Sequence, residues 1–183
     1  QAYEKASDVA HGLLALGMKP GDKVAIIGGT REEWCLSDFG LLLAGGVTVP
    51  IYQSSLRETV SYILNDSEAV YVFAEDKKQL DKLLAIRAEI PNVRQVFLWD
   101  GHAESDRQVD EWVTPLRELC DKGRGHRVQQ PNALPEVRTK QAGSDIATII
   151  YTSGTTGKPK GVATAAAGQP LDTATGVTTL GLL

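Results

Sequence analysis

Residues 146–161 read IATIIYTSGTTGKPKG, an apolar run followed directly by a loop of glycine, threonine, serine and lysine. The run is short, rich in isoleucine and without polar alternation, which is typical of a strand covered on both faces of a sheet. Gly154, Gly157 and Gly161 carry no Cβ atom, so the loop can approach a phosphate group closely. A strand that leads into such a loop places it at the carboxyl end of a parallel sheet, where α/β proteins bind ligands.

The loop also carries hydroxyl groups and positive charge at close spacing. Hydroxyls beside backbone amides supply several donors to one concavity, and lysines add charge near phosphate oxygens. Pro159 stiffens the loop and removes one amide donor. The residues assigned to ATP phosphate binding on these grounds are Thr152, Ser153, Gly154, Thr155, Thr156, Gly157, Lys158, Lys160 and Gly161.

Two better-known phosphate motifs do not fit this loop. Walker A requires G-x-x-x-x-G-K-[ST], whereas the spacing from Gly154 to Gly157 is shorter and Pro159 follows Lys158. The dinucleotide motif G-x-G-x-x-G is also absent from the sequence. A flexible linker without function is the remaining alternative, but linkers of that kind lack the lysines, the proline and the preceding isoleucine-rich run.

Upstream, helical patterns alternate with short apolar runs, which predicts an α/β fold: a layered, mainly parallel sheet with flanking helices. Strands are predicted over 24–27, 48–52, 69–73 and 93–98, and helices over 2–16, 30–44, 55–65, 76–90 and 110–121. Capping boxes are expected at the start of the helices that begin at Thr30 and Ser55. The Asp76 side chain is expected to cap the next helix. Residues 123–136, rich in glycine, glutamine and proline, are interpreted as a surface excursion.

Composition bounds the class of protein. Hydrophobic residues make up 42% and charged residues 23%, as in an ordinary soluble domain. The net charge of −4 argues against a nucleic-acid partner. No apolar run approaches the ~20 residues of a membrane span, and the polar start does not resemble a signal peptide. Two distant cysteines, Cys35 and Cys120, suit a reducing compartment and are expected to be packing residues, so the cytoplasm is the expected location.

Several residues that could carry chemistry receive a structural interpretation. His11 and His102 have no partner at catalytic or metal spacing and are given no role. The basic residues 124–127 could touch an anion, although a solvated loop is the commoner explanation. Core packing, and not ligand contact, is predicted for Trp34, Leu36, Leu41, Leu42, Leu43 and Tyr52.

Residues 151–161 resemble, residue for residue, the signature loop of the adenylate-forming enzymes, which include acyl-CoA synthetases, luciferases and peptide-synthetase adenylation domains. Other segments are similar to the long-chain fatty acyl-CoA synthetase branch: Trp34, Asp38-Phe39, Ala44-Gly45-Gly46-Val47, Val49-Pro50-Ile51-Tyr52, Ser54-Ser55 and Tyr62-Ile63-Leu64-Asn65-Asp66-Ser67. The resemblance covers 1–162 and implies a partial N-terminal AMP-binding domain, an incomplete portion of the adenylate-forming large domain.

This resemblance implies a two-step ligase that uses ATP, Mg²⁺ and coenzyme A. A fatty carboxylate attacks the α-phosphorus of ATP to give acyl-adenylate and pyrophosphate, and the thiol of coenzyme A then takes the acyl group. The loop would hold the β- and γ-phosphates. Of its two lysines, Lys160 is the preferred candidate for phosphate contact over Lys158, because the family pattern has a fixed lysine at the position of Lys160. Thr155 or Thr156 would lie near Mg²⁺. Because the implied substrate is a lipid, peripheral contact of a cytoplasmic protein with a membrane is also compatible with the resemblance.

The chain departs from the family pattern after Val162. Residues 163–183 are almost entirely alanine, threonine, glycine and leucine, and Asp172 is their one charge. We therefore expect an atypical low-complexity tail, disordered or artefactual. The adenine-binding motifs, the Thr-Glu pair near Mg²⁺ and the C-terminal domain with its catalytic lysine have no counterpart, so the catalytic residues are unknown and the isolated chain is not expected to make acyl-CoA.

Three functions remain open from the sequence. The first is part of a long-chain fatty acid–CoA ligase. The second is a fatty acyl-AMP ligase or the adenylation part of a carboxylate reductase. The third is a non-catalytic nucleotide-binding or interaction module.

Overall fold

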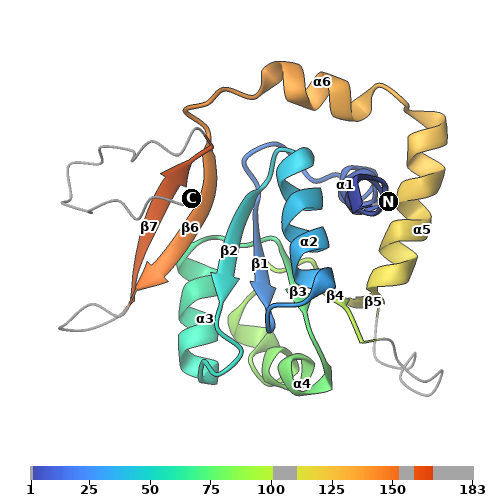
Figure 1. Cartoon of the computed structure of the whole chain (residues 1–183). Coiled ribbons are helices and arrows are strands. Elements are labelled where there is room, and N and C mark those ends of the chain that lie inside the picture. Colours follow the sequence, from blue (N-terminus) through green and yellow to red (C-terminus); the bar gives the residue numbers. More distant parts are fainter. Residues whose placement is uncertain (1, 101–110, 153–158, 167–183) are drawn as a thin grey trace.

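The computed structural model describes residues 2–100, 111–152 and 159–166 (Figure 1). The helices are α1 (Ala2–Ala15), α2 (Glu32–Leu43), α3 (Arg57–Asp66), α4 (Lys77–Ala85), the 3₁₀ turn η1 (Arg87–Glu89), α5 (Leu116–Gln129) and α6 (Ala133–Lys140). The strands are β1 (Lys23–Ile27), β2 (Val47–Ile51), β3 (Tyr71–Ala74), β4 (Gln95–Leu98), β5 (Val113–Pro115), β6 (Ile146–Thr152) and β7 (Lys160–Ala165).

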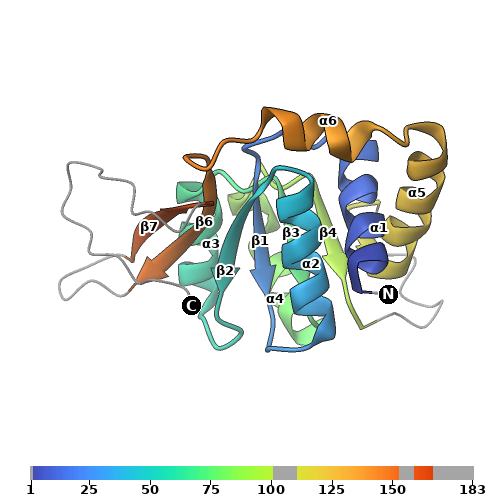
Figure 2. The same ribbon diagram turned by 45° about the horizontal axis from the view of Figure 1, so that its top comes forward.

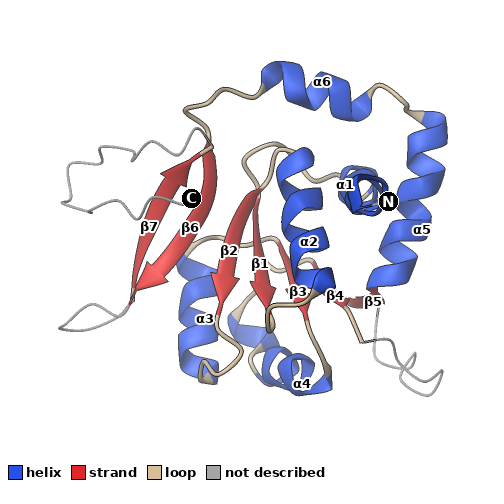
Figure 3. Ribbon diagram, viewed as in Figure 1, coloured by secondary structure: helices blue, strands red, loops and turns tan. Residues whose placement is uncertain are grey.

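The strands form one sheet in the order β5-β4-β3-β1-β2-β6-β7. Every pairing from β5 to β6 is parallel, and β7 alone among the described strands runs antiparallel to its neighbour. The α/β fold with a mainly parallel sheet is therefore confirmed. The carboxyl ends of β1, β2 and β6 lie along the same edge of the sheet (Figure 3).

Helices cover both faces of the central strands, and the side chains of β1 show how. Ala25 and Ile27 pack in the layer that contains α3 and α4, whereas Val24 and Ile26 pack in the layer that contains α1, α2 and α5. An apolar run without alternation suits this position, because both faces of the strand are buried. Figure 2 shows α1, α2 and α5 gathered on one side of the sheet.

Only one of the predicted helix caps forms. The Asp76 carboxylate accepts a hydrogen bond from the backbone N–H of Gln79 at 2.9 Å, as predicted. The capping box at Thr30 is wrong: α2 begins at Glu32 without a side-chain cap, and the Glu33 carboxylate instead accepts a 2.6 Å hydrogen bond from Arg31 Nε. A guanidinium competes well for a carboxylate, since both groups are charged. The box at Ser55 is also wrong, because α3 begins at Arg57 without a side-chain cap.

The region interpreted as a surface excursion is helical. The predicted helix over 110–121 starts at Leu116 and continues through Gln129, and α6 follows it. Glycine is disfavoured inside a helix by propensity alone. Tertiary packing reverses the argument at Gly123, because a Cβ atom there would overlap the backbone carbonyl of Asp8.

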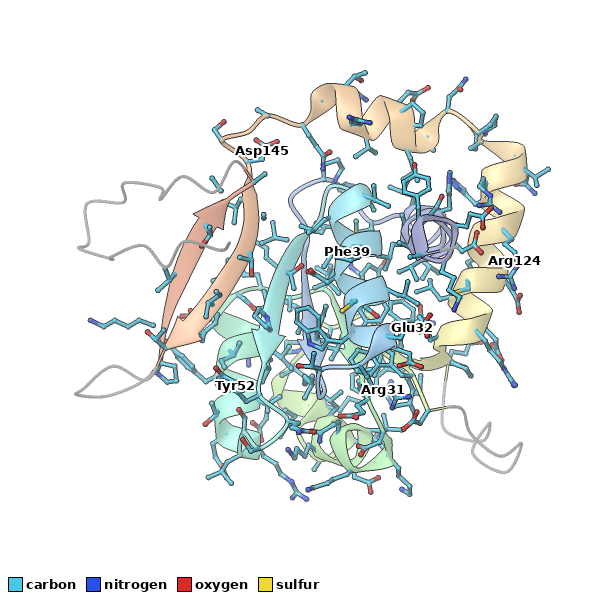
Figure 4. The ribbon with its side chains drawn as sticks, in the orientation of Figure 1. Arg31, Glu32, Phe39, Tyr52, Arg124 and Asp145 are labelled. Carbon is cyan, nitrogen blue, oxygen red and sulfur yellow. The ribbon has the colours of Figure 1, made fainter. Side chains whose placement is uncertain are left out.

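The core predictions around α2 are confirmed only in part, because Leu36 and Leu42 are half-buried and belong to neither apolar cluster. Leu41 is fully buried, and Trp34 and Leu43 pack against the same cluster. Tyr52 is an exception with 79% of its surface exposed, so its predicted packing is wrong. It directly follows Ile51, the last residue of β2, at the carboxyl end of that strand (Figure 4).

Candidate functional site

The predicted phosphate loop connects two antiparallel strands. In the β6–β7 ladder Tyr151 lies opposite Gly161 and Thr152 lies opposite Lys160. Thr152 and Lys160 are both exposed, at the carboxyl end of the parallel strands. The structure thus brings the first assigned residue beside Lys160, and it places both at the edge where the loop was predicted.

The remaining assignments stay predictions. Ser153, Gly154, Thr155, Thr156, Gly157 and Lys158 lie outside the described residues, and so do the two threonines considered for Mg²⁺. Among the residues that the structure does describe, no group of three or more histidine, cysteine, aspartate or glutamate side chains could hold a metal ion. The described part of the site consists of the base of the loop and the contacts that hold it.

The tyrosine that precedes the loop is tied to α3. Tyr151 Oη donates a 2.6 Å hydrogen bond to Asp66 Oδ2, and Tyr62 Oη donates to Asp66 Oδ1 at 3.3 Å. The two tyrosine rings meet edge to face with centroids 6.4 Å apart. Burial, followed by the Asp66 carboxylate, raises the pKa of Tyr151, so its hydroxyl remains a donor at neutral pH. This contact fixes the end of β6 against α3.

A chain of threonine hydroxyls ties β6 to α2. Thr148 Oγ1 donates to the carbonyl of Thr48 at 3.0 Å, and Thr48 Oγ1 donates to Asp38 Oδ1 at 2.6 Å. Burial raises the pKa of Asp38, and the hydrogen bond from Thr48 opposes that shift. Asp38 and Asp66 entered the sequence analysis only as parts of similar segments, and spacing along the chain gave no sign of these contacts.

Gly161 has a packing role that the sequence did not reveal. A Cβ atom at this position would lie 2.9 Å from Ile149 Cγ2 and 3.1 Å from Tyr151 Cζ. The side chains of β6 therefore occupy the space beside Gly161, and a glycine in β7 lets them lie there. The assignment of Gly161 to phosphate binding remains a prediction in addition to this packing role.

Polar contacts also order the sheet edge beyond the hairpin. Arg31 forms ion pairs with Asp100 at 2.9 Å and with Glu75 at 3.8 Å, in addition to its bond with Glu33 (Figure 4). The Glu75 carboxylate also accepts a 2.8 Å hydrogen bond from the backbone N–H of Gly29. Carboxylates thus surround Arg31, and its charge is compensated by the protein.

Lys82 holds the loop that follows β2. Its ammonium donates to the carbonyls of Gln53 at 2.6 Å and Ser55 at 3.0 Å. Desolvation by burial lowers the pKa of Lys82, and the nearby charge of Lys78 acts in the same direction. The ordered edge therefore continues from β3 across β1 and β2 towards the hairpin.

The basic residues of α5 contact α1 and do not form a solvated loop. Arg124 and Arg127 each lie 3.2 Å from a carboxylate oxygen of Asp8. His11 Nδ1 lies 3.0 Å from His126 Nδ1, a ring partner that spacing along the chain did not indicate. His102 lies outside the described residues.

The two cysteines differ in exposure. Cys120 packs against the core beside α1, and burial raises the pKa of its thiol to about 11. Cys35 is exposed, so its predicted packing role is wrong. None of the helices in the described ranges is long and apolar enough to cross a membrane.

Comparisons with known proteins agree on one family. The family model described as AMP-binding enzyme matches residues 1–178. The long-chain-fatty-acid–CoA ligase FadD15 of Mycobacterium bovis is 37% identical over 161 residues, which is 88% of this chain and 25% of that protein. The long-chain-fatty-acid–CoA ligase ACSBG1 of Rattus norvegicus is 34% identical over 88% of this chain and 22% of its own length. The chain thus spans about a quarter of the length of these relatives.

Solved structures show the same fold. The N-terminal domain of FACL13 from Mycobacterium tuberculosis has a TM-score of 0.69 and 29% identity, covering 91% of this chain and 36% of that one. A fatty acyl CoA synthetase from Mycobacterium tuberculosis has a TM-score of 0.67 and 28% identity, covering 91% of this chain and 28% of that one.

Proposed function

The chain belongs to the AMP-binding enzyme family, and from that premise we propose that it is part of an ATP-dependent long-chain fatty acid–CoA ligase. The observation that carries the proposal is the β6–β7 hairpin. It presents Thr152 and Lys160 side by side at the carboxyl edge of the sheet, at the two ends of the loop that matches the family signature. The names of the relatives, long-chain-fatty-acid–CoA ligases, support the substrate class.

The proposed reaction has two steps. A fatty carboxylate oxygen forms a bond to the α-phosphorus of ATP while the bond from that phosphorus to the pyrophosphate oxygen breaks. The thiol of coenzyme A then loses its proton to solvent, its sulfur attacks the acyl carbonyl carbon, and AMP leaves with the electron pair of the broken mixed anhydride. Negative charge grows on pyrophosphate in the first step, so fixed donors and cations at the phosphates lower its barrier.

The described residues of this chain would position the phosphates. The exposed ammonium of Lys160 lies at the base of the loop and would face the leaving pyrophosphate. Thr152 would contribute its hydroxyl and amide from the opposite strand. Mg²⁺ bound with the nucleotide would neutralise phosphate charge, with Thr155 or Thr156 beside it. The Tyr151–Asp66 contact keeps the loop base at a fixed place relative to α3.

The 183 residues on their own are proposed to bind ATP without producing acyl-CoA. The adenine-binding motifs and the catalytic lysine implied by the family pattern have no match in the sequence. The proposed location is the cytoplasm, with peripheral contact to a membrane that supplies the fatty acid.

ATP binding to the purified chain tests the proposal. Lys160→Ala is expected to weaken binding by about tenfold or more, since a charge-assisted contact to phosphate contributes about 1.5–3 kcal/mol and each 1.4 kcal/mol is about tenfold. The matched control is Lys140→Ala, an exposed lysine of α6, which should leave the affinity unchanged. Titration calorimetry in the presence of Mg²⁺ measures both. Equal ATP affinities for the two variants would show that Lys160 does not contact the phosphates.

The product is tested with a protein that also contains the downstream regions of the relatives. Incubated with a long-chain fatty acid, ATP and coenzyme A, it should release acyl-CoA. Accumulation of acyl-AMP in the presence of coenzyme A would support the fatty acyl-AMP ligase alternative instead.

A further inference from the structure

Helix α5 packs against α1 at unusually short range. Glycines lie at the crossing on both helices, Gly12 in α1 and Gly123 in α5. A Cβ atom on Gly12 would overlap the carbonyl oxygen of Leu119, and one on Gly123 would overlap the carbonyl of Asp8. The close backbone approach brings polar side chains of the two helices into contact beside the crossing, with His11 and Asp8 buried and the α5 partners partly exposed.

Two histidines meet at this crossing. His11 is 2% exposed, and its Nδ1 atom lies 3.0 Å from Nδ1 of His126, with the ring centroids 5.3 Å apart. A hydrogen bond between two imidazoles requires one nitrogen to donate and the other to accept through its lone pair. The pair can therefore hold one protonated ring but not two, since a second proton would set two N–H groups against each other.

Charged side chains surround the histidine pair. Asp8, which is 8% exposed, faces Arg124 and Arg127 together, so one carboxylate already compensates two guanidinium groups. Asp121 on α5 also pairs with Arg124. The described groups whose charge acts on His11 are Asp8, His126 and Arg127.

Other charged groups near the crossing are already paired or neutral. The Cys120 thiol next to Asp8 is protonated below a pKa of about 11. On the α2 side of α1, Lys5 pairs with Glu32 at 2.5 Å. Further positive charge at the histidines would therefore find Asp8 as its counter-charge, and that carboxylate already faces two guanidinium groups.

We propose that the His11–His126 pair makes the docking of α5 on α1 proton-sensitive: a single hydrogen bond between the two rings holds the helix in place, and a second proton on the pair releases it. The consequence reaches the proposed nucleotide site through the chain itself. Helices α5 and α6 form the connection that crosses from β5 at one side of the sheet to β6 at the other (Figure 1). Release of α5 would free the arm that leads into the strand before the phosphate loop.

The direction of the effect follows from the His11 environment. Burial lowers the pKa of His11, and the charges of His126 and Arg127 lower it further, against the opposing charge of Asp8. The undocked state would protonate near the ordinary imidazole value of about 6.5. The released state then binds more protons, so docking is fully stable above that value and weakens as the pH falls below it.

Hydrogen exchange of the purified chain tests this inference. After correction for the intrinsic exchange rate, amides of α5 should exchange about tenfold faster at pH 5.0 than at pH 7.5, the equivalent of one unit of pKa difference. EDTA in both buffers keeps a metal ion from bridging the two nitrogens. Unchanged α5 protection in the natural sequence between these two pH values would by itself overturn the proposal.

Two substitutions assign the effect to the histidine pair. His126→Gln keeps a polar side chain without a titrating group, and it should reduce the response of α5 to less than threefold. His126→Lys places a fixed cation beside His11, and it should speed exchange of α5 already at pH 7.5. His102→Gln is the control and should respond as the natural sequence does. A full response in His126→Gln would show that other groups carry the pH dependence.

Discussion

Strands β1 and β6 both read as apolar runs, yet the molecule holds them in different ways. Val24, Ala25, Ile26 and Ile27 of β1 are at most 1% exposed, whereas every residue of β6 is half-buried or exposed and Ile146 reaches 37%. Strand β1 is paired with β2 along five residues, but the β2–β6 register contains only the pair Thr48–Thr148. The centre is thus held by full burial on two faces, whereas the hairpin is attached by partly buried side chains and by hydrogen bonds to α3 and β2.

This difference separates stability from site placement. Substitutions in the centre should change the free energy of global unfolding, because they remove buried apolar contacts. Substitutions at the hairpin should shift or loosen the base of the phosphate loop while the central sheet stays closed, since locally weaker regions can open alone.

The largest effect is expected for Phe73→Ala. Phe73 is fully buried in β3 and lies 5.1 Å from Phe97 between ring centroids. Its truncation should lower the free energy of unfolding by about 3–5 kcal/mol, measured by urea denaturation. The exposed Phe39 of α2 gives the matched control, and Phe39→Ala should change it by less than about 0.5 kcal/mol. Similar losses in both variants would contradict the central role of burial.

A smaller effect is expected for Gly161→Ala in the hairpin. The added methyl would press on Ile149 and Tyr151, and overpacking of this kind costs about 1–3 kcal/mol. Hydrogen exchange should speed up in β6 and β7 and remain unchanged in β1. Gly29→Ala serves as the control at the end of β1, because its Cβ would meet only ordinary contacts at 3.6–3.7 Å. If β1 opened together with the hairpin, the two regions would form one cooperative unit.

Two tyrosine hydroxyls extend the comparison to single hydrogen bonds, one to a carboxylate in the hairpin region and one to a carbonyl in the core. Tyr151→Phe removes the bond to Asp66, and Tyr71→Phe removes a 3.1 Å bond to the carbonyl of Leu16. Each should cost about 0.5–1.5 kcal/mol. We expect the first loss to appear as faster exchange in β6 alone and the second as a lower midpoint of thermal unfolding. The reverse assignment would show that Tyr151 supports the core.

The smallest expected effect is a change in the rate at which a thiol reagent modifies the two cysteines. At pH 8 exposed Cys35 should react quickly, whereas Cys120 should react slowly because burial raises its thiol pKa to about 11. Gly161→Ala should leave the Cys120 rate unchanged, and Phe73→Ala should raise it severalfold. A faster Cys120 reaction in Gly161→Ala would indicate that opening of the hairpin spreads to the core.

The same difference explains which parts could be predicted from the sequence. Buried strands such as residues 24–27 are composed almost entirely of apolar residues, so the sequence alone predicts the central strands of the sheet. Strand β5 escaped because it has three residues and ends in Pro115, so only its pairing with β4 defines it. Strand β7 escaped because its first residues, Lys160 and Gly161, had been assigned to the loop.

The contacts that hold the site could not be derived from spacing. Tyr151 and Asp66 lie 85 residues apart, and Thr148 lies 100 residues from its partner Thr48. Local sequence patterns carry information about neighbours within a turn or a strand. Pairings over such separations depend on which strands become adjacent, and this is set by the whole sheet.

The reversal of direction at β7 has an electrostatic consequence. In many phosphate sites the chain continues from the glycine-rich loop into a helix, whose aligned peptide dipoles add the equivalent of about half a positive charge. Here the described chain after the loop is the strand β7, and strands carry little net dipole. The proposed site therefore lacks the dipole of a helix directly after the loop, and a larger share of its attraction for phosphate would come from lysine ammonium groups. Side-chain cations in water are screened by salt, so the hold on ATP should weaken as ionic strength rises.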